Sequence, residues 1–357
     1  MGDLCPVNCG LRSMTDAVAG SRVRTYARWL LALLLAGLAA WLSIRQVHWP
    51  ELASVLGRVN LGLFLLALLT VLATTGVKAV RWYFLLPAAA PKVPLNHVLR
   101  VLFIGQMANT FLPRLGDVLR TVLLGPRAAG GIPAVLGTIL VEKALDGVMG
   151  LLVLTGLALW TPLPVWLRAP LLGLVGLTVV LLFMVAWASL NPGWLNPLWR
   201  RLALRLPAPL SRRIEQLAAS FLLGLGLFRT PSRALVALAL SGAVWVLAML
   251  TNVATLGALG IEAPLWSAWL VLAAVYAATF LPTVPAQIGV FEYAAVLSLQ
   301  AANVGPEPAL AFALVLHLLV QAPPAVLGPI AMAIEGLSWG KLRAAQRRKL
   351  EGDRVPS

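Results

Sequence analysis

Charged side chains are scarce in this sequence. Asp, Glu, Lys and Arg make up 11% of the 357 residues, whereas 60% are hydrophobic and the mean hydropathy is +0.88. An ordinary soluble domain carries about a quarter charged residues, so this chain has too little polar surface to coat a water-soluble protein. The composition therefore excludes a soluble globular protein and a disordered chain, and it indicates an integral membrane protein.

Cysteines and cofactor motifs are also scarce. Cys5 and Cys9 lie in a polar amino-terminal stretch, with no second pair to complete a zinc site or a disulfide framework. The stretch from Gly336 to Lys341 is one residue short of a phosphate-binding loop, lacks its Ser or Thr and follows no strand. We therefore expect no metal and no cofactor. The net charge of +15 is spread over a chain too apolar to present one basic face, so no nucleic-acid partner is expected either.

Hydrophobic segments long enough to cross a membrane recur along the chain. About 17 to 25 apolar residues in a helix span the hydrocarbon layer. The segments that qualify are residues 28–44, 61–86, 133–160, 170–190, 234–259 and 308–335. The sequence thus predicts an all-α fold, a polytopic membrane helical bundle with six spanning helices. We expect an amino-terminal tail at 1–27, a single membrane domain at 28–340 and a basic tail at 341–357.

Two further apolar segments, residues 95–124 and 265–304, are interrupted by proline and glycine. The residues at the interruptions, which we expect to act as hinges, are Pro113, Gly116, Pro282, Pro285 and Gly289. Irregular backbone at membrane depth is tolerated where protein or a water-filled cavity surrounds it, so both segments are predicted to be re-entrant hairpins. The alternative is that these residues kink ordinary packed helices, and the second segment is then two full spans.

Lys and Arg residues set the predicted orientation, because basic loops stay in the cytoplasm. With the amino terminus inside, 24 of the 28 Lys and Arg residues are cytoplasmic, Lys143 is within the membrane, and only Arg45, Arg58 and Arg168 lie outside. Both termini are then cytoplasmic. The cytoplasmic loop at 191–233 has the periodicity of an amphipathic helix that lies on the inner leaflet or packs on the protein.

The two interrupted segments share a short sequence. Thr-Phe-Leu-Pro ends at Pro113 in the first and at Pro282 in the second, and each copy is followed by a Gly and then a carboxylate. In the predicted topology the first segment enters from the cytoplasm and the second from outside. This arrangement is an inverted-topology repeat, with units at about 61–160 and 234–335, in which broken helices meet near the midplane.

Ionisable side chains inside the apolar segments are the candidate functional residues, because they are costly in lipid and usually functional. Glu142, Lys143 and Asp146 lie inside one predicted span, where Lys143 and Asp146 are spaced to pair. The predicted substrate-binding set comprises Asn109, Arg114, Asp117, Arg120, Glu142, Lys143, Asp146 and Glu292.

The two arginines of this set, Arg114 and Arg120, can offer guanidinium forks to a phosphate head group, with the carboxylates orienting them or carrying protons. The alternative is that the set forms structural ion pairs that fix helix register. His317, alone on an apolar helix, is predicted to be a hydrogen-bonded packing residue rather than a proton relay.

Three blocks of the sequence resemble a known family. They are residues 109–124, Val141-Glu142-Lys143-Ala144-Leu145-Asp146, and Leu281-Pro282-Thr283-Val284-Pro285-Ala286-Gln287-Ile288-Gly289-Val290-Phe291-Glu292. Together they look like the signature blocks of the lysylphosphatidylglycerol synthase transmembrane, or flippase-like, family, over about residues 61–335. The resemblance implies a bacterial inner-membrane protein. In the two-domain members this region is thought to move an aminoacylated phospholipid between leaflets.

The sequence departs from the family pattern in several places. Asp117 stands for the usual Glu and Lys143 for the usual Arg, which keeps each charge, although Lys lacks the bidentate fork of Arg. Ala286-Gln287 replaces Gly-Gly and stiffens the second interruption, and His317 replaces an Arg often found in the last helix.

The expected function is translocation of a phospholipid or lipid-linked head group between leaflets, through a polar cavity between the two hairpins. A homo-oligomer is compatible with this function. Only 22 residues follow Glu335, too few for the family's soluble transferase domain, so aminoacyl transfer is not expected. The alternatives are an ion-coupled transporter of a small solute with Glu142 or Asp146 as proton carrier, a membrane-embedded transferase with Asp117 and Glu142 as acid and base, and a non-catalytic scaffold.

Overall fold

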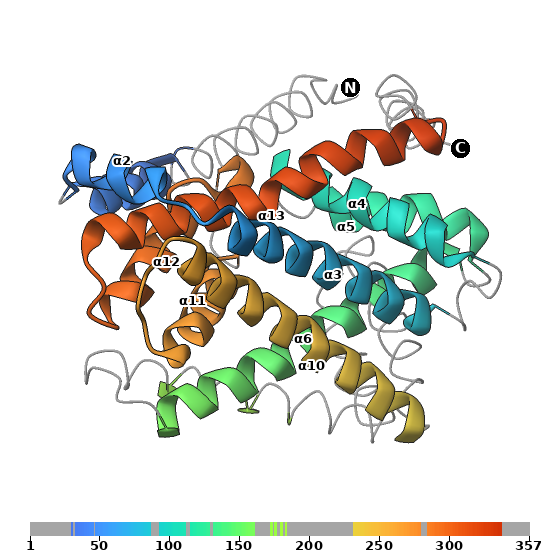
Figure 1. Ribbon diagram of the computed structural model, residues 1–357. Coiled ribbons are helices and arrows are strands. Elements are labelled where there is room, and N and C mark those ends of the chain that lie inside the picture. Colours follow the sequence, from blue (N-terminus) through green and yellow to red (C-terminus); the bar gives the residue numbers. More distant parts are fainter. Residues whose placement is uncertain are drawn as a thin grey trace, which may run out of the picture.

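The computed structural model describes residues 30, 33–45, 47–86, 93–111, 115–128, 131–160, 231–279 and 284–337, with a few positions between 172 and 183. All regular elements in these ranges are helices (Figure 1). The predicted all-α fold is therefore confirmed for the described part of the chain. The tails at 1–27 and 341–357 and the loop at 191–230 lie outside these residues.

The helices fall into two length classes. The long helices are α3 (Leu61–Leu85), α6 (Gly131–Trp160), α10 (Pro231–Ala258) and α13 (Pro306–Ile334). The short ones are α2 (Trp49–Gly57), α4 (Leu95–Phe111), α5 (Leu115–Leu124), α11 (Leu265–Ala278) and α12 (Val290–Gln300). Two 3-10 turns, η1 (Gly125–Arg127) and η3 (Pro285–Gln287), precede α6 and α12. At about 1.5 Å per residue only the long class exceeds the thickness of the hydrocarbon layer.

Three helices are both long and apolar enough to cross a membrane, namely α3, Leu235–Ala258 within α10, and α13. They coincide with three of the predicted spans. Helix α6 coincides with a fourth and is equally long, but it carries Glu142, Lys143 and Asp146 in its middle. The span predicted at 28–44 is represented by the apolar helix Leu33–Ile44, and most of the span predicted at 170–190 lies outside the described residues. The chain is therefore a multi-pass membrane protein.

Each interrupted segment consists of two short helices that pack on each other. Helices α4 and α5 form the first pair, and α11 and α12 form the second. Residues 112–114 and 280–283 lie outside the described residues, and they include Pro113, Arg114 and Pro282. The predicted interruptions are thus breaks between separate helices.

Helix α13 runs through the length of the molecule and contacts both broken pairs (Figure 1). It packs on α4 of the first pair and on α12 of the second, and it also contacts α2 and α3. Its side chains Phe312, Leu316 and Leu319 are buried in the largest hydrophobic cluster. Helix α3 lies along α10, and the Asn60 backbone N–H donates to the Ala258 carbonyl oxygen at 2.7 Å, which joins the start of α3 to the end of α10.

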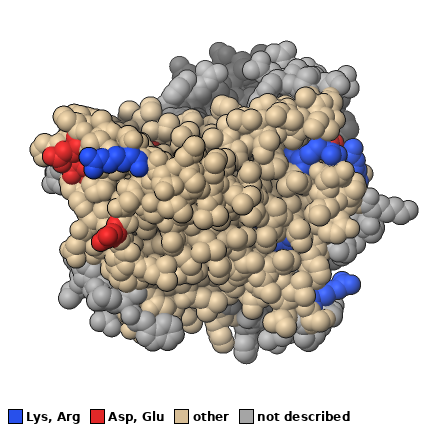
Figure 2. Space-filling model, in the orientation of Figure 1, with Lys and Arg blue, Asp and Glu red and all other residues tan. Residues whose placement is uncertain are grey.

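On the face drawn in Figure 2, the described part has few charged side chains between two charged ends. In Figure 2 the Lys, Arg, Asp and Glu side chains gather at the left and right edges, with a wide uncharged band between them. Large hydrophobic side chains of the long helices are exposed, among them Leu69, Leu235 and Val326. An apolar surface of this extent would be unfavourable in water, so it matches contact with lipid.

Helices α4 and α5 approach so closely that a glycine is required. A Cβ atom added at Gly116 would lie 1.9 Å from the Gly105 carbonyl oxygen, and one added at Gly105 would lie 2.7 Å from the Arg120 side chain. Backbone therefore contacts backbone at this crossing, and a side chain would force the two helices apart.

We predict that Gly116→Ala destabilises the protein by about 1–3 kcal/mol or more, because the methyl group overpacks this crossing. Gly76→Ala is the matched control, since a Cβ at Gly76 in α3 meets no atom within 4 Å. Alanine there should be neutral or stabilising by about 0.5–1 kcal/mol, because it favours the helix. Thermal unfolding in detergent measures both variants. Equal melting temperatures for the two would contradict the close crossing.

Candidate functional site

The side chain of Arg81 on α3 is completely buried between α6 and α10. Its guanidinium donates hydrogen bonds to both carboxylate oxygens of Asp146, at 2.6 and 3.3 Å, and to the Ser241 hydroxyl on α10 at 3.0 Å. It also lies 3.5 Å from a carboxylate oxygen of Glu142. A buried guanidinium needs such partners, since an unpaired charge in an apolar interior is very costly.

The side chain of Arg120 on α5 forms a second pair with the same region of α6. It donates to Glu142 at 2.6 Å, and it lies 3.8 Å from Asp117. Its guanidinium stacks over the Trp82 ring at 4.0 Å from the ring centroid, in the geometry of a cation–π contact. Lys143, which is half exposed, lies 3.6 Å from Asp117 at the edge of the group.

Ion pairs link these six side chains into one group, which we call the ion cluster: Arg81, Asp117, Arg120, Glu142, Lys143 and Asp146. Three are basic and three are acidic. The cluster joins α3, α5 and α6, and Glu142 contacts both arginines. Because each buried charge has an opposite charge beside it, the group can persist inside an apolar bundle.

The ion cluster contains most of the predicted site residues but pairs them differently. Lys143 contacts Asp117 rather than Asp146, and Asp146 is bound by Arg81. Glu292 is bound elsewhere, as described below, and Arg114 lies outside the described residues. The i,i+3 spacing showed only that Lys143 and Asp146 could meet, and the nearer partners come from other helices.

Arg81 is missing from the predicted site, which takes no residue from the span predicted at 61–86. The structure places it within α3, where none of its surface is exposed. The signal was present in the sequence, since Arg81 falls inside the span predicted at 61–86 and an arginine in an apolar span is usually functional or paired.

The second break is held by His317 of α13. Its ring nitrogens lie 2.5 Å from the Glu292 carboxylate and 2.9 Å from the Ala286 carbonyl oxygen, and its ring stacks on Phe291. This agrees with the prediction of a hydrogen-bonded packing residue. Glu292 also accepts from the Gly289 N–H at 2.7 Å, which caps the start of α12.

The backbone at this break is left-handed over several residues. Ala286 and Gln287 have φ angles of 57° and 62°, and Gly289 has 86°. Residues other than glycine rarely adopt such angles, and surrounding contacts must hold them there. At Ala286 these contacts are the hydrogen bonds that its carbonyl accepts from His317 and Gln321.

The two breaks are connected through a single side chain of α13. The Gln321 amide nitrogen donates to the Ala286 carbonyl at 3.3 Å, and its amide oxygen accepts from the Thr110 hydroxyl at the end of α4 at 3.0 Å. We call Thr110, Gln321 and Ala286 the break bridge. Asn109, beside Thr110, accepts from the Gly116 N–H at 2.7 Å and so spans the first break. Asn109 is thereby placed at a break, outside the ion cluster.

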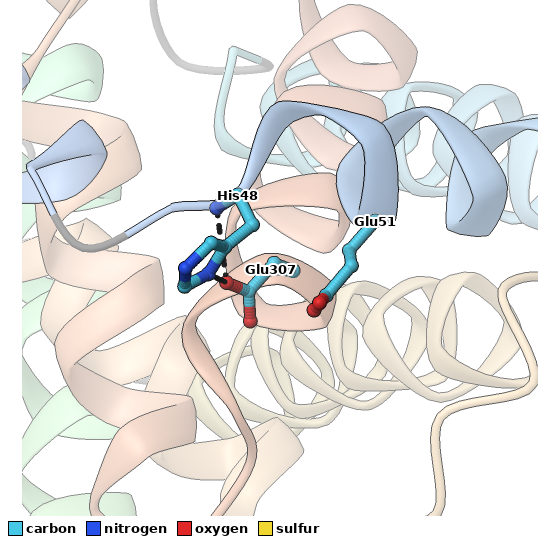
Figure 3. A group of neighbouring side chains, drawn as sticks. All are labelled: His48, Glu51 and Glu307. Atoms are coloured by element: carbon cyan, nitrogen blue, oxygen red, sulfur yellow. Dashed lines mark hydrogen bonds and ion pairs between the residues drawn. The ribbon is translucent and has the colours of Figure 1, made fainter.

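A separate group of side chains lies where α2 meets the start of α13 (Figure 3). His48 before α2, Glu51 in α2 and Glu307 at the start of α13 bring their ligand atoms within 4.8 Å of one another. The His48 ring and backbone nitrogens both contact one Glu307 oxygen, at 3.0 and 3.1 Å. Imidazole and carboxylate groups are donors that a divalent metal accepts, so these residues are the ones among those described that could hold such an ion. Their observed contacts tie α2 to α13.

Apolar helices of membrane-spanning length, exposed apolar side chains and a buried cluster of ion pairs define a multi-pass membrane protein with a polar interior. The chain belongs to the lysylphosphatidylglycerol synthase TM region family, whose model matches residues 29–328. That family is the one indicated by the resemblance in sequence. The comparison with curated proteins finds no match.

We predict that Arg81→Met destabilises the protein strongly, by about 3–5 kcal/mol, because it leaves buried carboxylates without their guanidinium. The double variant Arg81→Met/Asp146→Leu should be more stable than Arg81→Met alone, since it removes one uncompensated charge. Lys143→Met is the control, and it should cost about 1 kcal/mol or less because Lys143 is half exposed. Unfolding in detergent provides the double-mutant cycle. Strictly additive effects of the two substitutions would contradict the pairing.

The contact between His48 and Glu307 should make stability depend on pH. The hydrogen bond to Glu307, together with the charges of Glu51 and Glu307, raises the pKa of His48 above its ordinary 6.5. A raised pKa means that protonated His48 stabilises the folded state fully below pH 6.5, and that this contribution is lost as pH rises through the higher folded value. Melting temperatures between about pH 6 and 9 should therefore fall less in His48→Gln than in the unsubstituted protein. Identical pH profiles would contradict this contact.

Proposed function

We propose that this protein is a lipid translocase of the bacterial inner membrane, with both termini in the cytoplasm. It would move a phospholipid or lipid-linked head group between leaflets, along polar groups enclosed by the two broken pairs. The observation that carries the proposal is the break bridge, because two interrupted helix pairs that touch inside an apolar bundle are typical of transport sites. A lipid head group is the proposed partner, and a homo-oligomer remains compatible with it.

The chemistry at the two breaks supports an inverted repeat. At the first, the Gly116 N–H is bound by a side-chain oxygen of Asn109, and at the second the Gly289 N–H is bound by one of Glu292. A Cβ on either glycine would collide with a carbonyl oxygen of a packed helix, that of Gly105 or of Ala36. At both breaks, a glycine whose N–H is bound by a side-chain oxygen therefore lies in close contact with the backbone of another helix. We infer that they are equivalent units that enter the membrane from opposite sides as re-entrant hairpins.

Polar contacts at the second break also favour a hairpin that stays within protein. Backbone groups released by a broken helix must be satisfied internally, because lipid supplies no hydrogen bonds. The Ala286 carbonyl receives two side-chain donors from α13, and the end of α11 and the start of α12 pack against the helix Leu33–Ile44. The hinge role of Pro113, Gly116, Pro282, Pro285 and Gly289 belongs to this proposal.

In this proposal Arg114 and Arg120 have different roles. Arg120 is nearly buried and its guanidinium is bound to Glu142, so a phosphate could reach it only by displacing that carboxylate. Arg114 lies outside the described residues, and from its place in the sequence beside the first break we assign the first contact with a head-group phosphate to it. Asp117 and Lys143 lie at the more exposed edge of the cluster, where a charged head group can replace the ion pair between them.

A second candidate function is favoured by the pair of Glu292 and His317. The pair lies at a helix break, so an ion that binds the Glu292 carboxylate would change its contact with His317 and thereby couple an ion gradient to the break bridge. The same device would serve either an ion-coupled lipid translocase or a transporter of a small solute. Binding of a water-soluble ligand without copurifying lipid would identify the solute transporter.

We predict that vesicles containing the purified protein exchange fluorescent phospholipid between leaflets, and that Arg114→Ala slows this exchange at least tenfold without lowering the melting temperature, because it removes the proposed charge-assisted contact with phosphate. Arg58→Ala is the matched control, since Arg58 is an exposed arginine that follows α2. Exchange of inner-leaflet lipid is measured by chemical quenching of the outer leaflet.

An unchanged rate in Arg114→Ala would remove the phosphate role of Arg114. Vesicles that exchange no lipid faster than protein-free vesicles would contradict the translocase itself. A modified lipid appearing from a labelled precursor would instead establish a membrane-embedded transferase.

A further inference from the structure

A charged hollow lies at the end of α13 that is remote from the cluster in Figure 3. It has a volume of about 540 Å³ and is lined by Val93, Pro94, His97, Arg100, Arg127 and Glu335. These residues come from the start of α4, from η1 and from the residue that ends α13. Figure 2 shows Lys and Arg side chains, with one acidic spot, gathered at this right-hand end.

Glu335 organises the basic side chains around the hollow. Its carboxylate accepts from Arg100 Nε at 2.6 Å and lies 2.8 Å from His97 Nδ1 and 3.9 Å from Arg127. Burial by itself raises the pKa of Glu335, but the hydrogen bonds from Arg100 and His97 outweigh it and lower the pKa below its ordinary range. The carboxylate is therefore ionised at neutral pH, and it holds the two arginines toward one place.

His97 lies between Glu335 and Arg127. Its Nδ1 is 2.8 Å from the Glu335 carboxylate, and its ring contacts the Arg127 guanidinium. Two arginines stand against one carboxylate here, so the hollow carries an excess positive charge. The start of α4 adds the partial positive charge of a helix amino terminus beside Pro94.

Several guanidinium donors at the hollow remain open. Among the described residues, hydrogen bonds engage only Nε of Arg100 and Nη1 of Arg127. Each guanidinium has five N–H donors in a planar fork, which matches phosphate oxygens. The Arg127 side chain is 57% exposed and that of Arg100 is 28% exposed, so an anion can approach both.

We propose that this hollow is a binding site for a phosphate group, with Arg100 and Arg127 as the anion-binding side chains and Glu335 and His97 as positioning residues. Exposed apolar side chains lie next to it along the chain, Leu95 beside Pro94 and Ile334 beside Glu335. A lipid phosphate in the hollow would place its acyl chains against such side chains. The inference deepens the proposed function, since it assigns a docking site for the phosphate at the end of the bundle where the sequence predicts the cytoplasm.

The test measures equilibrium binding to the full chain in neutral detergent, by titration calorimetry with inorganic phosphate, a short-chain phosphatidate and the matching diacylglycerol. We expect phosphatidate to bind and diacylglycerol not to bind. Arg127→Gln should weaken phosphatidate binding about tenfold, as expected for one lost charge-assisted contact. Arg127→Lys should weaken binding less than Arg127→Gln, because it keeps the charge but lacks the planar fork. Arg58→Gln, an exposed arginine outside the hollow, should have no effect.

Arg127 is more than half exposed, so these variants should fold, which the melting temperature checks. Phosphatidate binding that inorganic phosphate displaces supports a site open to free phosphate as well, and binding of phosphatidate alone supports a lipid head group. The inference is overturned if neither phosphate compound binds, or if Arg127→Gln binds as the unsubstituted protein does. It is also overturned if Arg58→Gln loses as much affinity as Arg127→Gln. The binding test requires no translocation. Phosphate binding at the hollow would therefore still hold if the vesicles exchanged no lipid, and lipid exchange would still hold if the hollow bound no phosphate.

Discussion

The structure depends on the burial of one guanidinium in an apolar bundle. Arg81 has no exposed surface, so its charge must be met by protein groups, and these come from Asp146 and Glu142 on α6 and from Ser241 on α10. These contacts fix the register of α3, α6 and α10 relative to one another. Because Glu142 also binds Arg120 on α5, the same constraint determines where the first broken pair lies against α6.

The breaks depend on a different kind of contact, between backbone groups and side chains. A helix that ends inside the bundle leaves N–H and C=O groups that lipid cannot satisfy. Here Asn109 and Glu292 take the exposed N–H groups, and His317 and Gln321 donate to the Ala286 carbonyl. Helix α13 supplies the last two donors and contacts both pairs, so its position relates one break to the other.

Features that follow from local composition were predictable. The long apolar runs became α3, α10 and α13, and the interruptions at Gly116 and Gly289 became real helix breaks. The partners of the charged residues were not predictable in the same way. Spacing along α6 allowed Lys143 to meet Asp146. In the structure, Lys143 instead contacts Asp117 of α5, and Asp146 contacts Arg81 of α3. Arg81 itself is missing from the predicted site, although it falls inside the span predicted at 61–86.

The sequence by itself determined that this chain is a helical membrane protein and where its helices are interrupted, because hydrophobicity and the backbone preferences of proline and glycine act over a few neighbouring residues. Only the tertiary structure decided which charges meet, that Gln321 joins Thr110 to Ala286, and that Glu335 gathers two arginines around a hollow. These contacts join residues far apart in the chain. Their free energies depend on distance and burial in space, which no local pattern encodes.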